Sequence, residues 1–129
     1  MSHTTTIPCS IRNIQALKTA AEKLGLAFHQ DQRKFKTYGE SRKCEHAIGL
    51  ANSSYGFEIG VIKKATAEQE YELAFDSMDS ALATIVGYEC QNLLQGYGVQ
   101  LTVQSMPFGW DYTLDRQQNG DLVMAWGHQ

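Results

Sequence analysis

The spacing of the apolar residues changes at Gly25, and this change constrains the fold more than any other feature of the chain. Over residues 14–24 the apolar side chains recur at helical spacing, after Asn13, a residue type favoured as a helix N-cap. Gly25 is a favoured C-terminal stop. Beyond it, apolar residues alternate with polar ones, which is typical of strands. The sequence therefore predicts a helix of about three turns followed by a series of strands.

Several segments after Gly25 are candidate strands, at residues 26–30, 34–38, 46–50, 57–63 and 70–76. In the last one, EYELAFD, apolar and polar residues alternate, with Glu70 and Glu72 on what we expect to be a solvent-exposed side. The N-terminal TTTIPCSI is rich in β-branched residues but contains Pro8, which has no N–H to donate. We expect it to be an edge strand or a strand end.

A second helix is predicted to begin near Asp76 or Ser77 and to be closed by Gly96 and Gly98. Its apolar stripe comprises Met78, Leu82, Ile85, Val86, Leu93 and Leu94. Residues 99–105 are ambiguous, since their alternation favours a strand and their position after a long helix favours further helical turns. Pro107 ends either element.

The C-terminal segment contains Asn119-Gly120, the preferred pair for a two-residue type I′ turn. WDYTLDRQ and DLVMAW flank this pair, so we expect a hairpin, held to the core by Trp110 and Trp126. The order of elements predicts an α+β fold, in which two or three helices pack on one face of an antiparallel sheet.

Length and composition are those of one soluble domain spanning residues 1–129, with 43% hydrophobic and 19% charged residues. No apolar run approaches the ~18 residues of a membrane span, and the N-terminus lacks a signal-like pattern, so we expect a cytoplasmic protein with no membrane contact. Cys9, Cys44 and Cys90 form no CxxC pair, which indicates reduced thiols, with Cys90 in the core.

Charge is distributed unevenly along the chain. Residues 1–64 carry ten Lys/Arg against five acids, whereas residues 65–129 carry only Arg116 against nine acids. If the two halves share one sheet, the molecule acquires a polarised surface that suits an acidic partner, nucleic acid or another copy of the chain.

The segment FKTYGESRKCEHAIG, residues 35–49, holds the densest set of polar side chains. A metal site would need Cys44 and His46 together with His29, His3 or Cys9, but a single CxH pair falls short of the usual zinc pattern. We therefore expect no metal and no cofactor. No catalytic motif is present either, although Cys44 follows two cations that could depress the pKa of its thiol.

The same segment is the main candidate binding region, and its basic residues are Arg33, Lys34, Lys36, Arg42 and Lys43. Phe35 and Tyr38 are candidate stacking surfaces for single-stranded nucleic acid. Asp31, Glu40 and Glu45 dilute the positive charge, so we interpret the segment as a basic surface turn between strands that acts only on an acidic partner.

A second candidate surface is the segment SMPFGW, in which Phe108 and Trp110 either form an interface or fill the core. Neither alternative is favoured by the sequence.

Six short segments together resemble the uncharacterised chloroplast reading frame thirty-five family of cyanobacteria and red-algal plastids. They are MSHTTT, IRNIQALK, YGFEIGV, EYEL, LLQGYG and NGDLVMAW, in the same order along the whole chain. The resemblance implies no established activity, a helix over residues 99–105, and genes that lie near a small companion protein and an ATPase of the AAA class. Members usually carry an Arg-Gly-Tyr type segment where this chain has Lys36-Thr37-Tyr38-Gly39.

These observations predict a non-enzymatic protein-interaction or accessory module with a polarised charge surface. The resemblance implies that it acts with an AAA-class ATPase or a small companion protein. One alternative is a nucleic-acid-binding or nucleic-acid-processing protein that uses the basic patch between Arg33 and Lys43. Another is a phage-encoded inhibitor of a host defence complex, whose acidic half mimics nucleic acid. The sequence leaves the identity of the partner and the oligomeric state open.

Overall fold

An antiparallel sheet of five strands, in the order β1-β7-β6-β5-β2, forms the centre of the computed structural model. The structure describes residues 4–37, 40–51, 56–76, 80–105, 110–118 and 122–128. The strands of this sheet are β1 (Thr4–Ile11), β2 (Leu26–His29), β5 (His46–Leu50), β6 (Ile59–Lys64) and β7 (Ala67–Asp76). Two further pairs, β3 (Lys34–Thr37) with β4 (Glu40–Lys43) and β8 (Trp110–Arg116) with β9 (Leu122–His128), form separate two-stranded sheets.

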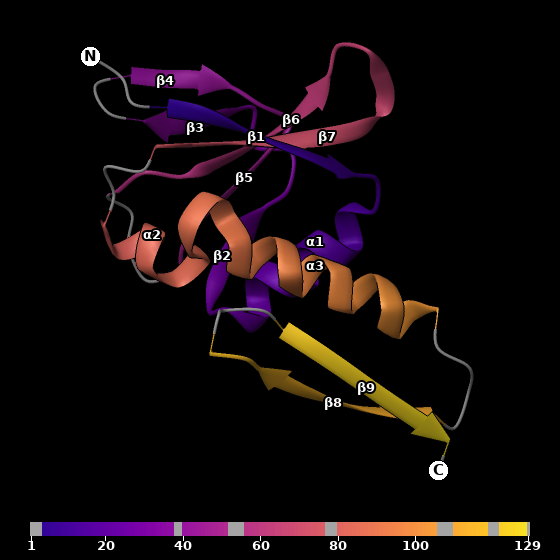
Figure 1. Cartoon of the computed structure of the whole chain (residues 1–129). Coiled ribbons are helices and arrows are strands. Elements are labelled where there is room, and N and C mark those ends of the chain that lie inside the picture. The colour runs from indigo at the N-terminus through magenta and orange to yellow at the C-terminus, as the bar shows by residue number, and fades with distance from the viewer. Residues whose placement is uncertain are drawn as a thin grey trace.

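Helices cover one face of the five-stranded sheet (Figure 1), which confirms the predicted α+β fold. They are α1 (Ile14–Lys23), α2 (Ser80–Val86), the short 3-10 helix η1 (Tyr88–Cys90) and α3 (Gln91–Gln104). The main core lies between these helices and the sheet, where Leu17, Leu82 and Leu93 meet Ile59 and Leu73. Burial of such large aliphatic side chains supplies most of the driving force for folding.

Helix α1 follows the sequence prediction closely. The side chain of Asn13 accepts a hydrogen bond from the Ala16 amide at 3.0 Å, which satisfies one of the free N–H groups of the first turn. Gly25 follows the helix with a positive φ of 81°, a conformation that glycine adopts without steric cost.

The prediction of one long second helix is wrong, because the chain breaks between α2 and α3. Gly87, Glu89 and Cys90 all have positive φ, at 82°, 50° and 60°. Residues in this conformation cannot continue a right-handed helix. The apolar pattern in the sequence continues across the break because α2 and α3 both bury their apolar side chains in the same core.

The prediction that Gly96 and Gly98 close the helix is also wrong, since α3 continues to Gln104. Residues 99–104 are therefore helical, which settles the ambiguous segment, and Ser105 is the C-cap. A Cβ added to Gly96 would lie 3.4 Å from the Cβ of Ala20 in α1. Gly96 thus allows α1 and α3 to approach closely and does not mark a helix end.

The β3–β4 hairpin packs on the sheet face opposite the helices (Figure 1). Residues 35–49 are mostly strand, so the prediction of a turn is wrong, although the basic side chains of β3 and β4 are exposed at the surface. The ring of Phe35 is fully buried with Cys44, Ala47 and Ala74. A Cβ added to Gly60 would lie 2.5 Å from two ring carbons of Phe35. Ala47, Gly60 and Ala74 are in register across three strands and form a row of small residues that receives the ring.

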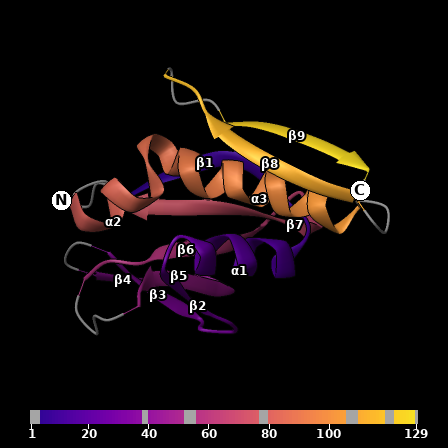
Figure 2. The same cartoon turned by 90° about the horizontal axis from the view of Figure 1, so that it is seen from below.

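The predicted C-terminal hairpin is present, with Tyr112 opposite Trp126 and Arg116 opposite Leu122. A two-residue turn at Asn119-Gly120 would place Arg116 opposite Val123, so the register of the described residues differs by one position from the prediction. Its Asn119-Gly120 turn lies outside the described residues, as do the side chains of Trp110 and Trp126, on which the predicted anchoring depends. Figures 1 and 2 show the hairpin beside α3, on the side of the helices away from the five-stranded sheet.

Strand β1 lies at the edge of the sheet, as Pro8 predicts. Its register with β7 shifts between Ile7 and Ile11, so the pairing is irregular on the stretch that contains Pro8. Among the described residues, none of the helices has the length and apolar character needed to cross a membrane.

Candidate functional site

The two faces of the β3–β4 hairpin differ in chemistry. Cross-strand partners point to the same side of a sheet, and Lys34 pairs with Lys43 while Lys36 pairs with Ser41. Phe35, between the two lysines of β3, points into the core, so the alternation of the strand turns Lys34 and Lys36 outward. We call the outward set, comprising Lys34, Lys36, Ser41 and Lys43, the lysine face; all four residues are exposed.

Lys34 and Lys43 are directly opposite each other. Cβ atoms of such a pair lie about 5 Å apart, and like charges in this position oppose strand pairing. Within the described residues, neither ammonium group has a carboxylate within 4.0 Å. The Lys34–Lys43 pair therefore does not stabilise the hairpin. A bound anion would relieve the repulsion between the two ammonium groups.

Two of the three acidic residues near the lysine face are held by other groups. Glu40 forms an ion pair with Arg42 at 2.9 Å, and Glu45 accepts a 2.6 Å hydrogen bond from the Lys63 amide. The Asp31 carboxylate, in contrast, is exposed, and its only basic neighbour within 4.0 Å among the described residues is His46, whose neutral ring does not bind it. The acidic residues therefore reduce the positive charge of the lysine face less than the sequence of the whole segment suggests.

The carboxylate of Glu58 fastens the hairpin to the sheet. It accepts hydrogen bonds from Nε2 of Gln32 at 3.0 Å and from the Lys36 amide at 3.1 Å, while the Glu58 amide donates to the Lys36 carbonyl at 3.0 Å. A Cβ added to Gly49 would lie 3.3 Å from Cγ of Glu58. Together with the buried Phe35, these contacts fix the orientation of the lysine face before any partner binds.

The turn that leads into β3 is held by a buried histidine. Nδ1 of His46 accepts a 3.0 Å hydrogen bond from the Asp31 amide, at a position where Asp31 has a positive φ of 62°. Burial lowers the pKa of His46, against the opposing effect of Asp31. The neutral ring with an unprotonated Nδ1 is the form that this hydrogen bond requires.

Cys44 does not have the reactive thiol that its basic neighbours suggested. Its Sγ donates to the Gln32 carbonyl at 3.1 Å, and burial, with the nearby charges of Glu45 and Glu58, raises its pKa to about 11. The depressed thiol pKa considered from the sequence is therefore wrong. The described residues contain no group of three or more His, Cys, Asp or Glu side chains that could hold a metal ion.

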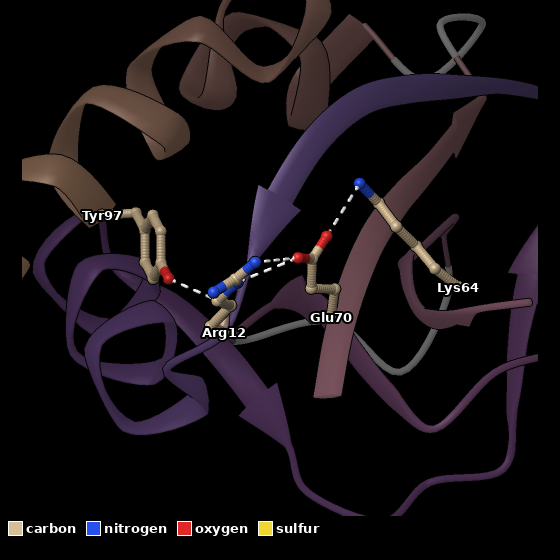
Figure 3. A network of polar contacts seen from close by, with 4 residues as sticks. All are labelled: Arg12, Lys64, Glu70 and Tyr97. Atoms are coloured by element: carbon tan, nitrogen blue, oxygen red, sulfur yellow. Dashed lines mark hydrogen bonds and ion pairs between the residues drawn. The ribbon is translucent and has the colours of Figure 1, made fainter. Parts of the chain in front are cut away.

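Two further cations of the basic half, Arg12 and Lys64, form ion pairs with Glu70 near the start of β7 (Figure 3). Glu70 is bonded by the Arg12 guanidinium, whose Nε lies 2.9 Å away, and by Nζ of Lys64 at 3.5 Å. The Arg12 and Ser10 side chains hold the pKa of Glu70 below its usual value. The hydroxyl of Tyr97 accepts from the amides of Arg12 and Asn13 at 3.0 and 3.2 Å. This network joins the basic and acidic halves, so Arg12 and Lys64 do not add to the lysine face.

The other predicted site residues divide into three groups. Arg33 is exposed next to the lysine face, whereas Arg42 is opposite Phe35 on the inner side of the hairpin, where it pairs with Glu40. Phe35 is buried, so its assignment as a stacking surface is wrong. Tyr38 and Phe108 lie outside the described residues, and only the backbone of Trp110 is described, in β8.

Sequence reasoning missed Ser41 and Glu58. The signal for Ser41 was the strand alternation over residues 34–43, which separates Lys34, Lys36 and Lys43 from Phe35 and Arg42. Nothing in the sequence paired Glu58 with Gln32, 26 positions earlier.

Comparisons with protein-family models, with curated proteins and with solved structures returned no match.

Proposed function

We propose that the protein is a non-enzymatic accessory module that binds an acidic surface of a partner protein through the lysine face. The observation that carries this proposal is the direct opposition of Lys34 and Lys43 on a hairpin that Phe35 and Glu58 hold in place. Because the backbone of the hairpin is held in place, only the lysine side chains have to be ordered when an anion binds. In line with the family resemblance, we propose an AAA-class ATPase or its small companion as that partner.

A protein partner is supported over single-stranded nucleic acid by two features. The buried ring of Phe35 is not accessible for base stacking. The net charge of the chain is −3, so a long polyanion that extends beyond the lysine face meets repulsion from the rest of the molecule. A compact acidic patch on a protein avoids that repulsion.

The test compares two variants with the same change in net charge. One carries Lys34→Gln, Lys36→Gln and Lys43→Gln; the control carries three substitutions outside the lysine face, Lys18→Gln, Lys23→Gln and Lys63→Gln. A fluorescent aspartate- and glutamate-rich peptide serves as the acidic probe, and an oligonucleotide of equal charge is titrated in parallel. Fluorescence anisotropy gives both affinities over a range of salt concentrations.

We expect the lysine-face variant to bind the peptide about tenfold more weakly, because each exposed charge pair contributes about 0.2–1 kcal/mol. The control should bind as the native chain does. Equal losses in both variants would show attraction to overall charge and would refute the proposal. Tighter binding of the oligonucleotide than of the peptide, with the same dependence on the three lysines, would replace the proposed function by nucleic-acid binding.

A further inference from the structure

The link between α2 and α3 adopts an unusual backbone conformation. Glu89 has φ 50° and ψ 37°, and Cys90 has φ 60° and ψ 28°, so two consecutive non-glycine residues are left-handed. Such strain persists only where the surrounding structure enforces it. Here Cys90 is fully buried, its amide donates to the Gly87 carbonyl at 3.1 Å, and Nδ2 of Asn92 donates to the Ile85 carbonyl at 3.2 Å.

Tyr88, which precedes Glu89 in this link, projects into solvent, with 81% of its surface exposed. It stands at the rim of a shallow hollow of about 460 Å³ that is widely open to solvent, between β1 and the start of α3. The hollow is lined by Ile7, Tyr88, Glu89, Gln91, Leu94 and Gln95. It lies on elements that do not include the β3–β4 hairpin, so it is separate from the lysine face.

The lining combines three kinds of group. Ile7 and Leu94 provide apolar surface, Tyr88 provides an aromatic ring, and Gln91 and Gln95 provide amide groups. Glu89 is the single charged side chain of this lining. No lysine or arginine occurs between Ala65 and Asp115, so this part of the chain supplies no cation of its own to Glu89.

These groups suit a ligand with an apolar stem and a positively charged end. A basic side chain packs its methylene groups on apolar surface while its charge stays near water and acceptors. An aromatic ring attracts a cation placed over its face. An anionic ligand would meet the carboxylate of Glu89, which also offsets the partial positive charge at the amino end of α3.

We propose that this hollow receives an arginine side chain from a peptide segment of a partner protein. Arginine is favoured over lysine because its planar guanidinium stacks on an aromatic ring and donates several hydrogen bonds in fixed directions. Tyr88 supplies the ring, while the Glu89 carboxylate and the Gln91 amide oxygen act as acceptors. Ile7 belongs to the edge strand β1, so the peptide backbone passes along the edge of the sheet.

The test uses a blocked tripeptide, acetyl-Gly-Arg-Gly-amide, and its citrulline analogue, which has nearly the same shape but no charge. Each is titrated into the full ¹⁵N-labelled chain, and amide chemical shifts report the position and affinity of binding. We expect the arginine peptide to shift amides between Tyr88 and Gln95, and the citrulline peptide to bind about threefold more weakly or not at all.

Three variants test the residues themselves. Tyr88→Ala and Glu89→Gln should each weaken arginine binding about threefold. Glu22→Gln removes an exposed carboxylate of α1 and should leave binding unchanged, as should the triple lysine-face variant. Tyr88 is so exposed that its replacement should not change the thermal unfolding midpoint, which separates loss of binding from loss of folding.

Equal binding of the citrulline peptide, or unchanged binding in Glu89→Gln, would overturn the proposal. Shifts confined to other parts of the chain would do the same. Because the lysine-face variant keeps an intact hollow, failure of this inference and failure of the proposed function are distinguishable.

Discussion

The two faces of the five-stranded sheet carry cores of very different size. On the helix side, aliphatic side chains from four elements or more, including Leu17, Leu73 and Leu93, pack into one large cluster. On the hairpin side, Phe35, Cys44, Ala47 and Ala74 form a small cluster with Ile62 at its margin. The large core accounts for most of the buried apolar surface and hence for most of the stability. The small core instead fixes the orientation of the lysine face.

The same strands build both cores by alternating the size of their residues. Val61 and Leu73 are in register and face the helices, whereas Gly60 and Ala74 are in register and face the hairpin. Consecutive residues of β6 and of β7 thus contribute to different cores. Large side chains exclude water on one side, and small ones leave room for a single aromatic ring on the other.

The largest expected effect tests the helix side. Leu73→Ala should lower the free energy of unfolding by about 2–5 kcal/mol, because Leu73 is fully buried and its truncation leaves a cavity. Urea unfolding measures this change. Leu101→Ala on α3 is the matched control, and since Leu101 is exposed its effect should stay within about 0.5 kcal/mol. Similar losses at both positions would contradict the assignment of the main core.

The next effect tests the hairpin side. Gly60→Ala should cost about 1–3 kcal/mol, since the new methyl group would overlap the ring of Phe35. Hydrogen exchange should speed up in β3 and β4 and stay unchanged in α1. Gly98→Ala provides the control, because a Cβ there meets nothing within 4 Å and should stabilise α3 slightly. Uniform acceleration over the whole chain would mean that the two cores are not separable.

Thiol labelling sharpens the comparison without any mutation. Burial raises the pKa of Cys44 to about 11 and that of Cys90 to about 12, so neither should react with iodoacetamide near pH 7 in the native state. As urea is added, Cys44 should become reactive at a lower concentration than Cys90, because it lies under the smaller core. Mass spectrometry of labelled peptides follows both sites. Simultaneous labelling would show that hairpin and helices open together.

The smallest effect is a pH dependence. Burial lowers the pKa of His46 in the folded state, so the unfolded chain binds the proton more readily. Stability should therefore decline as the pH falls below the ordinary histidine value of 6.5, until it passes the folded-state pKa. His46→Asn should flatten this decline, as measured by urea unfolding between pH 7 and pH 5. The contribution of Glu70 belongs to a lower window, below about pH 4.5. An unchanged pH profile in His46→Asn would show that another group is responsible.

Sequence patterns predicted the elements that depend on local chemistry. The Asn13 cap, the edge position of β1 and the C-terminal hairpin all follow from side-chain types at fixed spacing. The break at Glu89 and Cys90 could not be predicted, because neither residue type favours a left-handed backbone and the conformation is enforced by packing. For the same reason the sequence predicts a helix end at Gly96, whose actual role depends on Ala20 in a helix far away along the chain.

The candidate site was only half predictable. The lysines are evident in the sequence, but their common face becomes clear only when Phe35 is known to be buried. That burial requires Gly60, 25 positions later, and the attachment of the hairpin to the sheet requires the carboxylate of Glu58. Long-range pairing of this kind leaves no local pattern in a single sequence.

The position of β1 has a consequence for the order of events during synthesis. Among the described strands β1 comes first in the chain, yet its partner in the sheet is β7, which ends at Asp76. The turn after β1 also depends on Tyr97, more than 80 residues later, whose hydroxyl accepts hydrogen bonds from the amides of Arg12 and Asn13. Such non-local contacts slow folding. Strand β1 therefore stays unpaired until β7 has also been made, and the turn that follows β1 is completed only when α3 is present.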